Sequence, residues 1–144
     1  MTTYKTLNER AGLQALAWIN FGVGGVTWRA GSIKEAVEEC VLCAAQDFGG
    51  LRGEQVSVAV YKVPISSSVL FAGHMGSVYL GESVDKDVLD ETQMYKEAEI
   101  PLLHLVKVAV PRVRKNGSAY SASYTAKVKR AVDAALEPFR YENI

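Results

Sequence analysis

Several residue types are scarce in this chain of 144 residues, and each scarcity excludes a class of protein. Two cysteines are too few for a disulfide scaffold of the kind found in small secreted domains. No apolar run approaches the roughly 20 residues of a membrane-spanning helix. The N-terminus lacks the basic and then apolar pattern of a signal peptide. We therefore expect a cytoplasmic protein without a membrane partner.

The chain also lacks net charge, since sixteen basic and sixteen acidic residues cancel. No overall field therefore draws it toward nucleic acid. Hydrophobic residues make up 49% and charged residues 22%, values that exclude a disordered chain. A chain of this length can build one hydrophobic core without disulfides or metal. We predict a single compact domain over residues 1–144 and no cofactor.

Capping residues and apolar spacing predict four helices. Thr6 and Glu9 form a capping box before residues 11–19, which are nearly all apolar and require cover on several sides. Ser32 and Glu35 form a second capping box. The helix that follows carries an apolar stripe at helical spacing, with Leu42 on the opposite, polar face. The stripe contains Ile33, Ala36, Val37, Cys40, Val41, Ala44 and Phe48.

Two more helices are expected over residues 84–97 and 126–137, the second ending at Pro138. The glycines of residues 22–25 are expected to end the first helix. Period-two alternation and short apolar runs predict strands. These strands cover residues 26–30, 55–63, 68–72, 77–80 and 102–110. Adjacent strands with helices at intervals predict an α+β fold, with a mostly antiparallel sheet and helices packed on one face.

The dipeptide Asn116-Gly117 lies between two alternating runs, which predicts a β-hairpin of residues 107–115 and 118–125. A two-residue turn would pair Arg114 with Ala119 and Arg112 with Ser121. Two arginines would then share one face of the hairpin with small hydroxyl groups. In the alternative, the last helix begins at Ser121 or Ser123, and this arrangement of serines does not form.

Charge is distributed unevenly along the chain. Residues 100–130 contain seven basic residues and no acidic one, whereas residues 82–99 contain seven acidic and two basic residues. The two segments either face each other or solvate their surfaces, or the basic segment binds an anion. Arginine forks donate bidentate hydrogen bonds to phosphate oxygens, which favours a phosphate-bearing ligand. The candidate ligand contacts are Arg112, Arg114, Lys115, Lys127, Arg130, Ser121, Tyr120 and His74.

Other possible sites are weaker. Cys40 and Cys43 form a Cys-x-x-Cys inside a predicted helix, and only His74 and His104 could complete a zinc site. We expect structural thiols and no metal. His74 lies in the glycine-flanked turn of residues 73–76, where it would be exposed as a ligand contact or base, or as an ordinary turn residue. Tyr120 has a structural alternative as a half-buried sheet residue.

The combined pattern favours a non-catalytic binding protein, because no nucleophile and base are set up for catalysis. It would hold a nucleotide or nucleic-acid phosphate through the basic hairpin and the following helix. The apolar first helix and the outward Leu42 predict a homo-oligomer. One alternative is a structural or assembly subunit, for example of a viral particle, with the hairpin as a docking arm. The other is a small enzyme whose active site lies between subunits.

Overall fold

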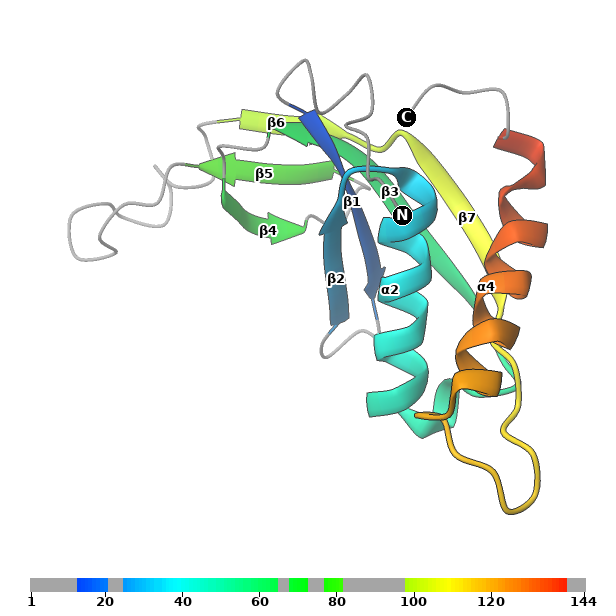
Figure 1. Ribbon diagram of the computed structural model, residues 1–144. Coiled ribbons are helices and arrows are strands. Elements are labelled where there is room, and N and C mark those ends of the chain that lie inside the picture. Colours follow the sequence, from blue (N-terminus) through cyan, green and yellow to red (C-terminus); the bar gives the residue numbers. More distant parts are fainter. Residues whose placement is uncertain (1–12, 21–24, 65–67, 73–76, 82–97, 140–144) are drawn as a thin grey trace, which may run out of the picture.

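The computed structural model describes residues 13–20, 25–64, 68–72, 77–81 and 98–139 (Figure 1). Four strands form an antiparallel sheet in the order β2-β1-β3-β7, and two helices pack on one of its faces. Three further strands form a second antiparallel sheet in the order β4-β5-β6. The predicted α+β fold, with an antiparallel sheet and helices on one face, is confirmed.

The elements have the following bounds. The four-stranded sheet consists of β1 (Leu13–Asn20), β2 (Gly25–Ala30), β3 (Gln55–Pro64) and β7 (His104–Ala109). The second sheet consists of β4 (Ser68–Ala72), β5 (Ser77–Gly81) and β6 (Ala98–Pro101). The helices are α2 (Ile33–Asp47) and α4 (Ala122–Leu136), followed by the short 3-10 turns Gly49–Leu51 and Glu137–Phe139, respectively.

The apolar segment predicted as the first helix is the strand β1, so that prediction is wrong. β1 lies between β2 and β3 and is buried on both faces. Ala17 faces the helices, whereas Leu16 belongs to a second buried cluster with Tyr61. A strand covered on both faces consists of a continuous run of apolar residues. Periodicity alone does not distinguish such a run from a buried helix. The predicted cap at Thr6 lies outside the residues described.

Gly25 begins β2 and does not end a helix as predicted. A Cβ atom at this position would lie 2.7 Å from the carbonyl oxygen of Ile19 and 2.8 Å from Nε1 of Trp18. Both distances are shorter than any contact a side chain tolerates. The close approach of β1 and β2 at this end of the pair therefore requires glycine. The other glycines of the predicted helix stop, residues 22–24, are outside the described part of the chain.

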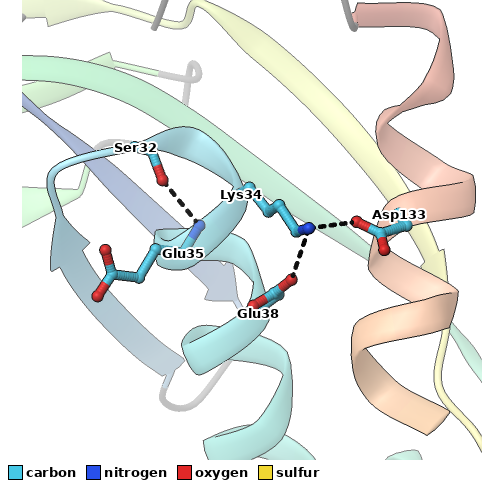
Figure 2. Close-up of polar contacts among 5 residues, drawn as sticks. All are labelled: Ser32, Lys34, Glu35, Glu38 and Asp133. Atoms are coloured by element: carbon cyan, nitrogen blue, oxygen red, sulfur yellow. Dashed lines mark hydrogen bonds and ion pairs between the residues drawn. The ribbon is translucent and has the colours of Figure 1, made fainter. Parts of the chain in front are cut away.

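Helix α2 follows its prediction closely. The Ser32 hydroxyl accepts a hydrogen bond from the backbone N–H of Glu35 at 3.2 Å, as the capping box requires (Figure 2). The predicted stripe is buried up to Ala44. Phe48 is 45% exposed because the helix ends at Asp47 and Phe48 leaves the helical conformation. Leu42 is half-buried against the core, so its predicted outward position is also wrong.

The predicted strands 26–30 and 55–63 are confirmed as β2 and β3. The predicted strands 68–72 and 77–80 are confirmed as β4 and β5, which pair in antiparallel fashion. The strand predicted over 102–110 is β7, but only one of its faces is buried. Val106 and Val108 face the helices, whereas Leu105 is 49% exposed, because β7 ends the sheet and its second face has less cover. The helix predicted over 84–97 falls outside the described residues.

The Asn116-Gly117 turn forms, but the hairpin predicted around it is wrong. Asn116 has a φ of 68°, and the N–H of Gly117 donates to the carbonyl of Arg114 at 2.7 Å. No strand follows this turn, because α4 begins at Ala122 with Ser121 as its N-cap. The predicted pairing of Arg112 with Ser121 therefore does not occur. The alternative of an earlier helix start at Ser121 is correct, and the C-terminal helix begins four residues earlier than residues 126–137 suggested.

A polar cluster joins the two helices at their exposed surface. Lys34 Nζ of α2 lies 3.1 Å from Asp133 Oδ1 of α4 and 3.8 Å from Glu38 Oε1 (Figure 2). The Glu38 side chain is only 13% exposed, and its Oε1 atom is buried without a hydrogen-bond donor. Burial therefore raises the pKa of Glu38, and the charges of Lys34 and Lys129 offset part of this effect.

The raised pKa of Glu38 makes stability depend on pH. The folded state binds this proton more tightly than the unfolded state, so the contribution is present at low pH and is lost as pH rises through the raised pKa. We expect Glu38→Gln to raise the free energy of unfolding at neutral pH by about 1 kcal/mol. The gain should shrink at about pH 4, near the ordinary pKa of glutamate. Urea denaturation at neutral pH and at about pH 4 measures the difference in the free energy of unfolding between the variant and the unaltered protein.

The matched control is Glu35→Gln, one turn earlier on the exposed side of α2. Its carboxylate lies near the positive N-terminal end of the helix, so its removal should leave stability unchanged or lower it slightly. A loss of stability in Glu38→Gln at neutral pH would show that the attraction between Glu38 and Lys34 exceeds the cost of burying the Glu38 carboxylate.

Candidate anion-binding site

The loop between β7 and α4 is anchored at both ends. The Tyr124 hydroxyl donates to the carbonyl of Pro111 at 2.7 Å, and the Tyr124 side chain is buried in the core. Gln46 Nε2 of α2 donates to the carbonyl of Ala119 at 3.1 Å. The start of the loop is thus held by α4 and its end by α2. The intervening cations lie on a loop that is held at both ends.

Ser121 organises the first turn of α4. Its hydroxyl accepts from the N–H of Tyr124 at 3.1 Å and donates to the carbonyl of Ser118 at 2.8 Å. Its carbonyl accepts from the N–H of Thr125 at 3.1 Å. The amides of Ala122 and Ser123 precede the helical hydrogen-bond pattern and have no intrahelical acceptor. Together with the helix dipole, these amides favour an anion at this end of α4.

A shallow hollow, open to solvent, lies at this helix end. Two cationic side chains, Arg114 and Lys127, and three serine hydroxyls line it. The full lining is Val113, Arg114, Gly117, Ser118, Ser121, Ser123, Tyr124 and Lys127. The hydroxyl oxygens of Ser121 and Ser123 lie 3.2 Å apart, so they form one hydrogen-bonding pair. Positive charge and hydroxyl donors thus meet in a single small space.

The structure brings together three of the residues predicted from sequence, Arg114, Ser121 and Lys127. Two further serines, Ser118 and Ser123, were not predicted as contacts. The hairpin register had assigned the serines to a strand, so their proximity to the helix start was missed. The signal that could have found them is their close spacing around the capping serine.

Four other predicted contacts, Arg112, Lys115, Arg130 and Tyr120, do not line the hollow. The Arg112 guanidinium lies over Gly53, where a Cβ atom would be 2.8 Å from its central carbon. Tyr120 is 69% exposed, and its hydroxyl lies 3.5 Å from the carbonyl of Gln46. His74 lies outside the described residues.

The predicted cations have no acidic partner within the described ranges. Arg112, Arg114, Lys115, Lys127 and Arg130 form no ion pair with a described carboxylate. Most of the acidic segment that could face them, residues 82–97, is not among the described residues. The positive charge around the hollow is therefore not neutralised by any carboxylate that the structure places.

The cysteines serve the core of the helix layer. Cys40 is fully buried, and its thiol donates to the carbonyl of Val26 at 3.3 Å. Burial raises the pKa of Cys40 to about 12. Burial, together with Asp47 and Glu39, also raises the pKa of Cys43. Because the thiolate is the reactive and metal-binding form, the buried Cys40 thiol is suited to packing, whereas Cys43 is only partly buried.

Two classes of site are missing from the described part of the chain. No three side chains of histidine, cysteine, aspartate and glutamate gather there in a way that could hold a metal ion. None of the helices found there is long and apolar enough to cross a bilayer. The hollow at the start of α4 is therefore the site with the clearest chemistry.

The anchoring of the loop can be tested with Tyr124→Phe, which keeps the buried ring and removes the hydroxyl. We expect the free energy of unfolding to fall by about 1 kcal/mol, because the Pro111 carbonyl loses its donor. Tyr120→Phe is the matched control, since the Tyr120 hydroxyl is exposed and its contact is long. Equal effects of the two changes in urea denaturation would contradict the anchoring role.

Comparison with known proteins assigns no role to this hollow. No protein-family profile, no curated protein and no solved structure matches the chain. The case for a function therefore rests on the geometry of the hollow and the cations around it.

Proposed function

We propose that the chain is a non-catalytic binding protein that holds a phosphate group in the hollow at the N-terminal end of α4. The observation that carries this proposal is the presence of Arg114 and Lys127 in one hollow at the start of α4. Guanidinium groups bind phosphate oxygens in bidentate fashion, and a lysine ammonium adds a second positive charge. The Ser121 hydroxyl already donates to the carbonyl of Ser118, so a further donor would come from Ser118.

Preorganisation supports the proposal. The loop that carries Arg114 is fixed by the hydrogen bonds of Tyr124 and Gln46 to its two ends. The turn at Gly117 is closed by a bond to the carbonyl of Arg114 itself. Little backbone entropy is therefore lost when an anion is bound, and more of the contact energy contributes to affinity.

The chemistry of the lining favours binding over reaction. Among its residues there is no histidine, carboxylate or thiol to act as general acid, general base or nucleophile. Its charged side chains are cations, which can stabilise an anion but do not by themselves move a proton. An enzyme with its active site between two subunits remains the alternative, because a partner could supply the missing groups.

Arg114→Ala and Lys127→Ala test the hollow, with pyrophosphate as the probe. We expect each change to weaken binding by about 1 to 3 kcal/mol, the range for a charge-assisted hydrogen bond. Both side chains are at least partly exposed, so circular dichroism should show an unchanged fold. Isothermal titration calorimetry in buffer without magnesium measures the affinity.

Arg112→Ala is the matched control, because Arg112 belongs to the same basic segment but lies over Gly53 and outside the hollow. It should leave pyrophosphate affinity nearly unchanged. Equal losses in Arg112→Ala and Arg114→Ala would show that general charge, and not the hollow, attracts the anion. Absence of pyrophosphate binding to the unaltered protein would refute the proposal.

A second candidate function, assembly with further copies of the chain, is favoured by the surface around β7. Leu102, Leu103 and Leu105 are exposed by 38%, 37% and 49%, respectively. β7 ends the four-stranded sheet, and no described strand pairs with its outer edge. Open edges beside apolar side chains favour pairing with another chain. The two sequence features that predict a homo-oligomer do not support it, since β1 is buried within the chain and Leu42 is half-buried against the core.

Light scattering after size exclusion tests assembly. We expect a mass above the 15.7 kDa of one chain at micromolar concentration. Leu105→Lys should reduce it toward the monomer, because a charge at the open edge opposes pairing. Phe48→Lys is the control, since Phe48 is similarly exposed at the end of α2. A monomeric mass for the unaltered protein would rule out assembly through β7.

A further inference from the structure

The positive charge of the hollow continues along one flank of α4. Ser123, Lys127 and Arg130 follow one another at spacings of four and three residues, so they lie on the same side of the helix. Ser123 and Lys127 line the hollow, whereas Arg130 lies beyond it and is exposed. We call Arg114, Lys127 and Arg130 the basic strip. It begins in the hollow and extends along the helix toward its C-terminal end.

Contacts of α4 define which way this flank faces. Val128 and Val132 are buried against the sheet, and Asp133 faces α2 through its contact with Lys34. Each residue advances around the helix by 100°, so Lys127 lies away from both of these sides, whereas Arg130 lies about 60° from Asp133 on the outer surface of the helix. The basic strip therefore runs over the solvent-facing side of α4, and Arg130 is its member nearest to Asp133. None of its members forms an ion pair with a described residue.

We propose that the ligand of this site is a single strand of nucleic acid, whose backbone follows the basic strip. This inference rests on the function proposed above and names its ligand class. One phosphate would occupy the hollow between Arg114 and Lys127, and a neighbouring phosphate would reach Arg130. A cationic groove that follows the sugar–phosphate backbone is the general means of binding single strands without regard to sequence.

The length of the strip argues against a ligand with one phosphate group. Arg130 lies three residues, a rise of about 4.5 Å, beyond Lys127. A phosphate held between Arg114 and Lys127 would be centred before this position, whereas a second, linked phosphate would meet Arg130 directly. Glu137, near the C-terminal end of the same flank, marks the limit of the strip.

The charges on the other side of α4 argue against a duplex. A duplex presents two backbones, and the second would need cations on another flank. The flank toward α2 instead carries Asp133, with Glu38 of α2 close to it across Lys34. One line of cations therefore matches one strand.

Arg130→Ala tests the inference, with a fluorescently labelled short oligothymidylate as the probe. We expect its affinity to fall about tenfold, as for the loss of one charge-assisted contact. The slope of log affinity against log salt should become shallower by about 0.7, the value for one phosphate of a single strand. Pyrophosphate affinity should not change, because Arg130 lies outside the hollow. Fluorescence anisotropy measures the first two quantities.

Lys129→Ala is the matched control, since it removes the same charge from the neighbouring position on a different flank of α4. Its smaller effect on oligothymidylate would confirm that position, and not net charge, governs binding. Equal effects of Arg130→Ala and Lys129→Ala, with pyrophosphate still bound, would contradict binding of a single strand. They would not contradict the proposed phosphate site in the hollow. Equal affinity for a duplex would also contradict a single strand as the ligand. If neither pyrophosphate nor oligothymidylate binds, the proposed function fails as well.

Discussion

The burial of β1 on both faces is the constraint on which the rest of the structure depends. Ala15 and Ala17 are fully buried beneath the helices, and their small side chains let α2 pack close to the sheet. The position of α2 in turn brings Gln46 to the carbonyl of Ala119 and Lys34 to Asp133. These two contacts hold α4 and its preceding loop. The flank that α4 turns to solvent is thus decided by the centre of the sheet.

The parts of the fold that could be predicted are those in which local chemistry and periodicity agree. Ser32 caps α2, and the apolar spacing of that helix matches its buried stripe. The prediction of a helix over residues 13–20 was wrong because every position except Gln14 and Asn20 is apolar. Such a run shows neither the helical nor the strand period. Only its partners, β2 and β3, make it a strand. Non-local pairing of this kind is not encoded in a short window of sequence.

In the candidate site, too, the residue composition could be predicted from the sequence but the positions of the residues could not. The excess of cations over residues 100–130 was visible in the sequence, but their grouping depends on the start of α4. Asn116-Gly117 signalled a turn correctly. The hydroxyl of Ser121 then caps a helix, and Tyr124 is drawn into the core, which prevents a second strand. Arg112 was separated from Arg114 by its packing over Gly53, a contact between distant segments that no spacing rule contains.

The two proposed surfaces lie on different sides of the sheet, so binding and assembly are compatible. Leu105 pairs with Ala59, whose cluster lies on the face opposite the helices, whereas the basic strip is on α4. Association through the edge of β7 would therefore leave the strip open in each copy. When copies of the chain are joined, a strand bound to one copy meets the basic strip of the next copy at a high effective concentration. A strip with few phosphate contacts is weak by itself at physiological salt, and joining several strips on one strand is the physical means by which such a protein would bind tightly.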